Sequence, residues 1–589
     1  MIIGIQIGET SGAAVYSKGK ILYAASEERF SGKKNDSNFP KMAIQRAVEL
    51  CDVRVNEIEK VVIATIHGDA VKQLTNVSSY SIGDWLKEQN QYWYPLIIEK
   101  KTDVDYLKVF DDKVEKTEYK KLLEDVLSGK DREAAFHDWV VREVRNIWDI
   151  DENKIVFINH ELSHAAWGYY GSSYEDFEDV MAVVFDGWGD ESNASIYEYK
   201  EGKIHQIKKY TNYNVGRIYR YITLLLGMKP LEHEYKVMGL APYATEYIYA
   251  KPLEVFRKAY DFIDGEVVVD SDLKDHYFYF KNRLEGMRFD GIAAALQIFT
   301  EEMNKKLIKF WMEKTGKKKL VLSGGVSLNI KANMEIGKMD CVEDLFVPGS
   351  GGDESHCMGA IFAYLDNCGR GNEIEKIKSL YLGDSLGETD VASTLAKAKN
   401  NGYVLQKKLD AADVANYLSK GLVIGRISGR MEFGARALGN RSILADPRNN
   451  EIIERINKKI KNRDFWMPFT PSILDEDKDK YLNNPKQLSF PYMTIGCETT
   501  EVGKNAIKAA IHPADKTARP QIVTEAINKE YYDIIREFKK LTGVGVLLNT
   551  SLNLHGYPIV RTAKQAFHVF ENSDLDGLLI NDNLILRDS

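Results

Sequence analysis

Residues 179–190 read DVMAVVFDGWGD, an apolar run that ends at Asp186 and passes directly into glycines. The same pattern recurs in KIVFINH (154–160), KKLVLSGG (318–325) and DLFVPGSGGD (344–353). A short apolar run bounded by turn residues is typical of a buried strand, and helical spacing separates such runs at 289–315. Strands that alternate with helices and end in glycine or aspartate predict an α/β domain that binds ligands at the carboxyl ends of its strands.

Two similar meanders, one at the start of the chain and one after residue 179, indicate a duplication. The chain opens with a strand at 2–7 and two strand-like runs around a Lys-Gly-Lys turn at 18–20. Residues 190–210 repeat this arrangement around a Glu-Gly-Lys turn. We therefore predict a duplicated, two-lobed nucleotide-binding domain over 1–370, with a helical insertion at about 70–150.

The chain of 589 residues is too long for one compact domain. A glycine-rich, charged stretch at 369–392 marks the predicted boundary. The remainder, 371–589, places the strand-like runs LVIGRIS, VGVLLNTS and LDGLLIND between helical segments. This order predicts a second domain of the α+β class.

Composition excludes several classes of protein. Hydrophobic residues make up 44% and charged residues 28%, which excludes wholesale disorder and a fibrous architecture. The net charge of −8 argues against a global positive field, so we expect no nucleic-acid partner. No apolar stretch approaches the roughly 18 residues of a membrane helix, and no leader peptide is expected. Five cysteines without a CxxC pair favour a reducing cytoplasm.

Two histidines and two aspartates form a candidate metal site. His160 and His164 are four residues apart, a spacing that stacks both imidazoles on one helix face about 6 Å apart along the axis. Asp186 and Asp353 each end a predicted strand beside glycines, which allow close approach to an ion. A His₂Asp₂ set suits a divalent ion such as Fe, Mn or Zn with open positions for substrate oxygen. Turn-forming aspartates are the alternative.

The string HELSH also matches the zinc-protease pattern HExxH, in which Glu161 would be the general base. No third ligand in a protease context follows, so this alternative ranks second.

Glycines and basic residues indicate places where phosphate could bind. SGGVSLN (323–329) has a Gly-Gly pair after a strand, which suits a backbone close to phosphate or ribose, although a tight turn has the same pattern. Between Arg426 and Arg463 stand ten basic and four acidic residues. A solvated helix face explains part of 451–463, but in GRMEFGARALGNRS (429–442) glycines and apolar residues separate the arginines, which favours an anion pocket. No Walker loop and no GxGxxG occurs.

Ten strings in the family's order carry a resemblance over nearly the whole chain. The sequence resembles the O-carbamoyltransferases of the nodulation-protein and tobramycin carbamoyltransferase type in INHELSHAA, DGWGD, NVGRIY, EYKVMGLAPY, LSGGVSLN, PGSGGDE, GRMEFGARALGNRSILADPR, NKKIKNRDFWMPF, KTARPQIV and LLNTSLNLHGYPIV.

The resemblance implies a fold and an activity. It implies an N-terminal domain like the threonylcarbamoyl-transfer protein of tRNA modification, in the sugar-kinase/actin/Hsp70 superfamily. It also implies a C-terminal domain like the carbamoyl-adenylate synthases of the double-stranded-RNA-binding type. The second domain would make carbamoyl-adenylate from carbamoyl phosphate and ATP, with Mg²⁺ accompanying the ATP. The first would transfer the carbamoyl group to a hydroxyl of a small molecule, a secondary metabolite or a glycan.

Residue by residue, the resemblance assigns three sets of side chains. The implied ligands of an iron(II) ion, or of another divalent transition metal, are His160, His164, Asp186 and Asp353. The implied catalytic residues are His160, His164, Asp186 and Lys34. The implied nucleotide-binding residues are Gly216, Gly324, Gly325 and Asn329, and those for carbamoyl phosphate and ATP are Arg436, Arg441, Lys461, Arg519 and Asn549.

The sequence departs from the family pattern at three places. Gly8-Glu9-Thr10 replaces His-Asp-Ser, and Lys34-Asn35-Asp36 replaces Lys-His-Asp, so two histidines that could assist deprotonation of the acceptor are lost. Met467-Pro468-Phe469 replaces Arg-Pro-Phe and removes a cation from the implied carbamoyl-phosphate pocket. The alternatives are a tRNA-modifying carbamoyltransferase and an impaired paralogue that acts as a binding or scaffold protein. A homodimer is left open.

Overall fold

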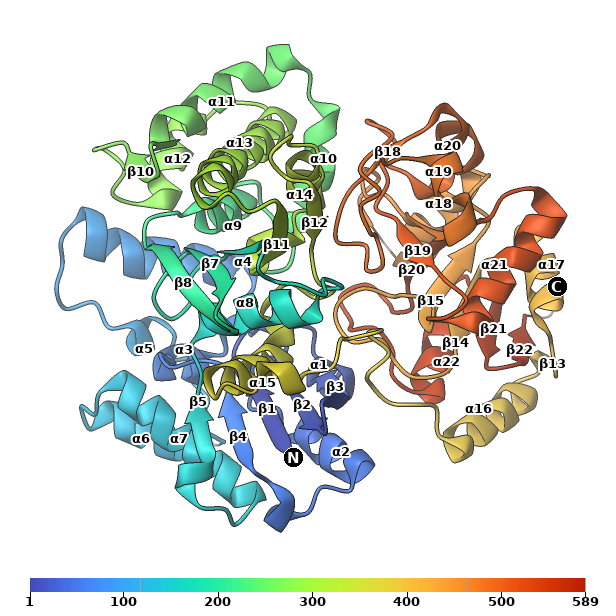
Figure 1. The fold of residues 1–589 in the computed structure, drawn as a ribbon, viewed down its shortest axis with the longest axis horizontal. Helices are drawn as coiled ribbons and strands as arrows, with labels where there is room; N and C mark the ends of the chain where they lie inside the picture. The colour runs from blue at the N-terminus through green and yellow to red at the C-terminus, as the bar shows by residue number, and fades with distance from the viewer. Residues whose placement is uncertain (117, 462, 588–589) are drawn as a thin grey trace.

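The computed structural model describes residues 1–116, 118–461 and 463–587. Two five-stranded sheets and their helices occupy the part before residue 370, and an eight-stranded sheet occupies the part after residue 403 (Figure 1). The segment between them carries a one-turn 3₁₀ helix (Gly371–Glu373) and helix α16 (Glu388–Asn400), and residues 374–387 form no regular secondary structure.

The first sheet has the order β3-β2-β1-β4-β5. Its first three strands form the predicted antiparallel meander, and β4 and β5 add in parallel. Helix α1 (Glu28–Ser31) follows the meander, and α2 (Lys41–Cys51) leads into β4. The strands are β1 (Ile2–Gln6), β2 (Gly12–Ser17), β3 (Lys20–Ser26), β4 (Lys60–Ile63) and β5 (Ile155–Phe157).

The second sheet repeats this topology as β8-β7-β6-β11-β12, with an antiparallel meander and two added parallel strands. The duplication predicted from the sequence is thereby confirmed. The strands are β6 (Val180–Phe185), β7 (Ala194–Lys200), β8 (Lys203–Tyr210), β11 (Lys319–Ser323) and β12 (Asp344–Phe346).

Two buried helices, α8 (His160–Gly171) and α15 (His356–Asn367), join the two halves. Each follows the last strand of its sheet, so the two helices are equivalent in the repeat. They pack closely because α15 carries Gly359, where a Cβ atom would lie 2.2 Å from the backbone oxygen of Ser163. This contact brings the first turns of both helices together in the centre of the N-terminal part (Figure 1).

Helical segments interrupt both halves. Between β4 and β5 lie α3 (Ala70–Thr75), α4 (Ile82–Lys87), a π-helix at Glu88–Ile98, α5 (Tyr106–Val109), α6 (Lys120–Leu127) and α7 (Arg132–Ile147). Between β8 and β11 lie α9 (Val215–Leu225), α10 (Glu234–Leu240), α11 (Glu246–Ala259), the hairpin β9 (Tyr260–Ile263) and β10 (Glu266–Val269), α12 (His276–Leu284) and α13 (Phe289–Thr315). Helix α14 (Ile330–Gly337) separates β11 from β12.

The C-terminal sheet has the order β13-β22-β21-β14-β15-β20-β16-β19 and is mainly antiparallel, which agrees with the α+β prediction. Its strands are β13 (Val404–Gln406), β14 (Ile424–Ile427), β15 (Arg441–Ala445), β16 (Thr470–Leu474), β19 (Gln521–Val523), β20 (Val546–Ser551), β21 (Gly577–Ile580) and β22 (Asn583–Leu586). The helices are α17 (Ala411–Ser419), α18 (Glu451–Ile456), α19 (Lys478–Tyr481), α20 (Glu501–Ala506), α21 (Lys529–Thr542) and α22 (Ala563–Glu571), and a small hairpin pairs β17 (Leu482–Asn483) with β18 (Glu498–Thr499).

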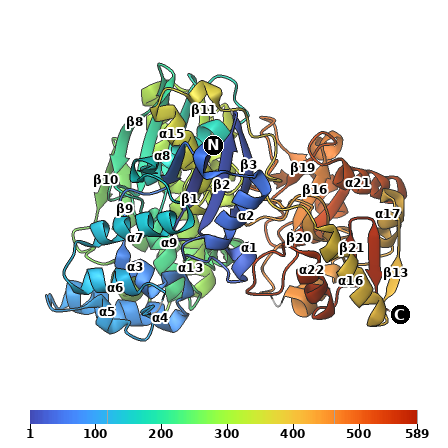
Figure 2. The ribbon, with the colours of Figure 1, turned by 90° about the horizontal axis from the view of Figure 1, so that it is seen from below.

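The two parts of the chain lie side by side in both views (Figures 1 and 2). Hydrogen bonds cross between them, for example from Arg29 to the carbonyl oxygens of Gly434 and Ile559. Within the described ranges, every helix is too short or too polar to cross a lipid bilayer.

Candidate functional site

Three histidines meet where helices α8 and α15 begin. His160 is the first residue of α8, and His356 is the first residue of α15. The ring of His356 lies 4.2 Å from that of His160 and 3.9 Å from that of His164, measured between centroids. His164 and His356 are fully buried. The pairing of His160 with His164 was predicted from the sequence, but His356 was missed.

Two carboxylates complete this cluster. Asp186 directly follows β6, and Asp353 begins the turn that leads into α15. The Nε2 atom of His160 lies 2.9 Å from an Asp186 oxygen and 3.7 Å from an Asp353 oxygen. The Nε2 atom of His164 lies 3.5 and 3.4 Å from the same two oxygens. The four residues predicted as metal ligands therefore lie together.

The residues present fit a divalent metal ion. One ligand atom each from His160, His164, Asp353 and His356 lie within 4.8 Å of one another. Both ring nitrogens of His164 and of His356 are buried without a hydrogen-bond partner. A buried polar atom left unpaired costs about 1–3 kcal/mol, so four of them at one point indicate a missing ligand. Imidazole and carboxylate donors together suit a transition-metal ion.

Charge within the cluster shifts the pKa values of its members. Burial alone would lower the pKa of His160, but the negative charges of Asp353 and Asp186 raise it to about 10. Burial would raise the pKa of Asp186, yet its contacts with His160 and His164 hold the pKa well below the usual range. Protons on His160 and His164 thus balance the carboxylates, whereas burial and the charges of these two histidines lower the pKa of His356. A bound metal ion would displace those protons.

Two further acids hold the first turn of α8 in place. Asp190 accepts hydrogen bonds from the backbone N–H groups of His160, Ile66 and His67. An oxygen of Glu161 accepts hydrogen bonds from the backbone of Glu191 and from Ser192. Because this carboxylate is 1% exposed and fastens a loop, it is not placed to act as the general base of a protease.

Glycines surround Asp186 where a larger residue would collide. A Cβ atom on Gly216 would lie 3.1 Å from the backbone oxygen of Asp186, and one on Gly325 would lie 3.2 Å from its carboxylate. Gly324 has a φ of +89°, and its Cβ would come within 2.1 Å of Phe185. Asn329 instead caps α14 and exchanges hydrogen bonds with Gln297. The nucleotide-binding role of these four residues stays a prediction.

A second cluster consists of cations. Arg436, Arg463 and Arg519 are half-buried, and within the described residues none of them forms an ion pair with a carboxylate. Burial and the positive charges of Arg436 and Arg463 lower the pKa of Arg519 well below its usual range. The Nε atom of Arg519 is buried without a hydrogen-bond partner. Mutual repulsion among unpaired cations indicates a site for an anion.

Lys461 belongs to this cluster, because burial and the charges of Arg463 and Lys34 lower its pKa well below the usual range. Its ammonium donates hydrogen bonds to Ser551 and Asn553, in the LLNTSLN segment.

Arg441 and Asn549 do not lie free in the cluster. The guanidinium of Arg441 is fully buried and donates to backbone carbonyl oxygens, including those of Ser428 and Asn440, so it has no donor directed at a ligand. The amide of Asn549 is equally buried and donates to Ala437 and Ser472. Both residues fix the strands and loops that carry the cations.

The metal cluster and the cation cluster adjoin one another. A Cβ atom on Gly434 would lie 1.7 Å from the Ser350 hydroxyl, so the loop that carries Arg436 rests on the loop that carries Asp353. The carboxylate of Glu354, next to Asp353, offsets the lowering of the pKa of Arg436 by burial. The structure thus brings together two clusters that are far apart in the sequence.

The departures from the family pattern lie around these clusters. Glu9 faces Arg220, with 3.4 Å between carboxylate and guanidinium. Lys34 is not a member of the metal cluster and pairs with Glu232 at 2.9 Å. Met467 is buried, and its sulfur would lie 3.3 Å from a Cβ atom on Gly239 of α10.

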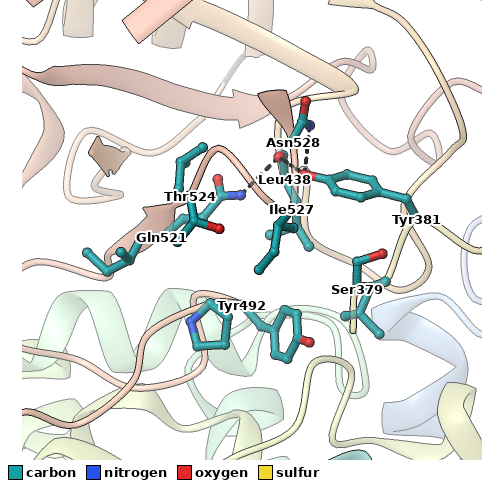
Figure 3. A pocket seen from close by; sticks show the side chains of 12 residues that line it. Ser379, Tyr381, Leu438, Tyr492, Gln521, Thr524, Ile527 and Asn528 are labelled. Carbon is teal, nitrogen blue, oxygen red and sulfur yellow. Dashed lines mark hydrogen bonds between the residues drawn. The ribbon is translucent and has the colours of Figure 1, made fainter. Parts of the chain in front are cut away.

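A small crevice lies between the connecting segment and the C-terminal sheet (Figure 3). Tyr381 and Gln521 both donate to the carbonyl oxygen of Leu438 there, and Asn528 donates to the Tyr381 hydroxyl. Its volume of about 20 Å³ is close to that of one water, so it is not a substrate site.

Comparison with known proteins identifies the family. The model "Carbamoyltransferase N-terminus" matches residues 1–362, and "Carbamoyltransferase C-terminus" matches residues 415–587. Nodulation protein NolNO of Sinorhizobium fredii is 29% identical over 588 residues, which cover 98% of this chain and 79% of the relative. Nodulation protein NolO of Bradyrhizobium diazoefficiens is 33% identical over 440 residues, covering 73% and 79%.

One solved structure, full-length HypF with bound phosphate and nucleotide, covers 64% of this chain and 56% of its own. Its TM-score of 0.34 at 11% identity is too low to support an argument. The family models span almost the whole of the chain, on both sides of the connecting segment. The chain therefore belongs to the carbamoyltransferase family and is a carbamoyltransferase.

Proposed function

We propose that this carbamoyltransferase is an ATP-dependent O-carbamoyltransferase that passes the carbamoyl group through a carbamoyl-adenylate. The observation that carries the proposal is the direct apposition of an unpaired cation cluster and an unpaired metal-ligand cluster across the Gly434–Ser350 contact. Such an arrangement suits a reaction in which an anionic intermediate forms at one site and is consumed at the other. The repeated sheet order further supports the assignment to the sugar-kinase/actin/Hsp70 superfamily.

The cation cluster is the proposed site of adenylate formation. Carbamoyl phosphate and ATP, with its Mg²⁺, are both highly charged anions. Arg436, Arg463 and Arg519 offer guanidinium groups that form no ion pair within the described parts of the chain. Hydrolysis of carbamoyl phosphate gives carbamate and inorganic phosphate. A carbamate oxygen then attacks the α-phosphorus of ATP and displaces pyrophosphate. The cations would hold the phosphates in line and stabilise the charge that develops on them.

The metal cluster is the proposed site of transfer. There the acceptor hydroxyl attacks the carbamoyl carbon, its proton passes to a base, and AMP leaves. His160, His164, Asp353 and His356, with Asp186 beside them, would hold a divalent ion, for which iron(II) is our choice. When bound, this ion would supply positive charge toward the nucleotide phosphate and the hydroxyl oxygen. Closeness of the two clusters would keep the labile adenylate from water.

Separating the two half-reactions tests this division. In Arg519→Ala, pyrophosphate release that depends on carbamoyl phosphate should fall at least tenfold, because a cation that contacts the substrate anions is removed. In Asp353→Ala, one equivalent of pyrophosphate should still form, but no compound should gain the 43 Da of a carbamoyl group, a difference that follows from replacing H by CONH₂. Arg370→Ala, at a surface ion pair just beyond the end of α15 that is opposite the metal cluster, serves as the matched control.

Three outcomes would contradict the proposal. Loss of both half-reactions in both variants would contradict the division between sites. Efficient restoration of activity on mixing the two variants would contradict the internal transfer, because the adenylate would then be diffusing freely. Absence of any AMP with every acceptor tried would favour a binding or scaffold protein instead.

A further inference from the structure

A polar cavity of about 300 Å³ lies where three segments of the N-terminal part meet one loop of the C-terminal part. The loop after α1, the turn after α3 and the segment between α9 and α10 supply most of its walls, and Gly556 supplies the C-terminal side. The lining residues are Lys33, Lys34, Asp36, Asn76, Ser78, Ser79, Lys229, Glu232 and Gly556. The proposed reaction assigns no ligand to this cavity.

Ammonium groups dominate the lining. Lys34 and Lys229 share one carboxylate, because their Nζ atoms lie 2.9 and 2.8 Å from the two oxygens of Glu232. Lys33 forms no ion pair within the described part of the chain. The second acid, Asp36, is buried and accepts hydrogen bonds from Asn38. The cavity thus holds three lysines but only two carboxylates: Glu232, which two of the lysines share, and Asp36, which accepts hydrogen bonds from Asn38.

The positive charge of the lysines lowers the pKa values of two neighbouring histidines. Burial, together with the charges of Lys236, Lys34 and Lys229, lowers the pKa of His233 to about 4, although Glu232 opposes the shift. Burial and positive charges, those of Lys236 and Lys34 first among them, also lower the pKa of His555. Neither histidine adds charge at neutral pH, so the excess belongs to the lysines.

The cavity adjoins the cation cluster on one side, and Arg220 connects it to the loop after Asp186 on the other. On one side, the charge of Lys34 acts on Lys461, and Gly556 belongs to the loop whose Asn553 accepts from Lys461. On the other side lies Glu234, two residues after Glu232, and its negative charge acts on Arg220. The guanidinium of Arg220 in turn lies 3.1 Å from the position that a Cβ atom on Gly187 would take. Gly187 directly follows Asp186.

We propose that this cavity binds an anionic group of the acceptor, so that the acceptor is a hydroxyl compound bearing a phosphate, sulfate or carboxylate. The inference rests on the proposed function, because it takes transfer to occur at the metal cluster. A volume of 300 Å³ accommodates a small charged group, and Lys34 and Lys229 each have further N–H donors to direct at it. A cationic acceptor would meet like charges here and is disfavoured.

Binding of a small probe tests the inference without knowledge of the true acceptor. Glycerol 3-phosphate should bind to the full chain and glycerol should not, as measured by titration calorimetry. In Lys229→Gln the Kd should rise at least fivefold, and Lys309→Gln, on the exposed face of α13, should leave it unchanged. Because phosphate could also bind the cation cluster, Arg519→Gln is titrated in parallel and should retain the binding.

The outcomes separate this inference from the proposed function. Loss of binding in Arg519→Gln but not in Lys229→Gln would overturn the inference, since the probe would then occupy only the cation cluster. Glycerol binding as tightly as its phosphate would also overturn it. Pyrophosphate release that depends on carbamoyl phosphate is measured on the native chain as an independent readout of the proposed function. Its absence from the native chain would contradict the proposed function, while the titrations would still report on the cavity.

Discussion

The metal cluster is buried and the arginines of the cation cluster are half-buried, and the two clusters differ in the kind of charged group that each gathers. At the start of α8 and α15, three imidazoles and two carboxylates leave ring nitrogens unpaired. Beside them gather three arginines and Lys461, none of which forms an ion pair with a carboxylate among the described residues. Neither arrangement favours the stability of the chain alone. The comparison teaches that the side chains of the two clusters suit ligands of opposite sign, a cation at the first and an anion at the second.

The largest expected effect follows from removing an imidazole. His164→Ala should abolish tight binding of a divalent metal ion and all carbamoyl transfer, because a fully buried ligand cannot be replaced by its surroundings. Metal content measured by plasma mass spectrometry on purified protein checks the first effect. His568→Ala, at an exposed position of α22, is the control and should keep full metal content.

His356→Ala sharpens the same test, because this residue was not predicted as a ligand. Equal metal loss in His164→Ala and His356→Ala would establish three imidazoles in the site. Full occupancy in His356→Ala would restore the predicted set of two histidines and two aspartates.

In the cation cluster we expect one substitution to weaken substrate binding and, at the same time, to stabilise the ligand-free chain. Arg519→Met should raise the KM for carbamoyl phosphate roughly tenfold to a hundredfold, because a charge-assisted contact of about 1.5–3 kcal/mol is lost. The same change should raise the free energy of unfolding of the ligand-free chain by about 1 kcal/mol, since it removes repulsion from Arg436 and Arg463. Urea denaturation monitored by circular dichroism measures the second effect. A destabilised variant would show that Arg519 is held by contacts rather than strained.

Local patterns were sufficient to predict most of the fold. The helix predicted at 289–315 coincides with α13, because it has a clear apolar period and ends at a defined boundary. The repeated meander also predicted the duplication, which the identical strand orders of the two sheets confirm. How the two domains meet was not predictable, since it depends on close contacts such as Gly434 against Ser350.

The sites were predicted in part. Spacing within one segment identified His160 and His164, and strand ends identified Asp186 and Asp353. His356 required a comparison between segments: it occupies in the second half the place of His160 in the first, three residues after Asp353. Composition could not distinguish Arg436 from Arg441. Arg436 forms no ion pair within the described residues, whereas the guanidinium of Arg441 donates to backbone carbonyl oxygens. Only the three-dimensional partners of a guanidinium decide its role.

The smallest expected effect concerns a histidine outside both clusters, which shows how a half-buried, hydrogen-bonded imidazole affects stability. His276 stacks on Tyr260 and shares a hydrogen bond of 2.7 Å with the Tyr260 hydroxyl. Burial and the charge of Arg217 lower the pKa of His276 to about 4, whereas an unfolded chain has its ordinary value of about 6.5. Between pH 6.5 and 4 the unfolded state therefore binds more protons than the folded state.

Stability from this residue is complete above pH 6.5 and is lost as the pH falls toward 4. Over that window the free energy of unfolding of the native chain should decline by about 1–2 kcal/mol more than that of His276→Gln, because glutamine carries no proton to gain. Denaturation at a series of pH values, with the metal ion at one fixed concentration, measures the difference. Parallel curves for the two proteins would show that His276 is as easily protonated as an exposed histidine. If the difference between the two unfolding curves changed with the concentration of metal ion, the stability of α12 would depend on metal binding at the metal cluster.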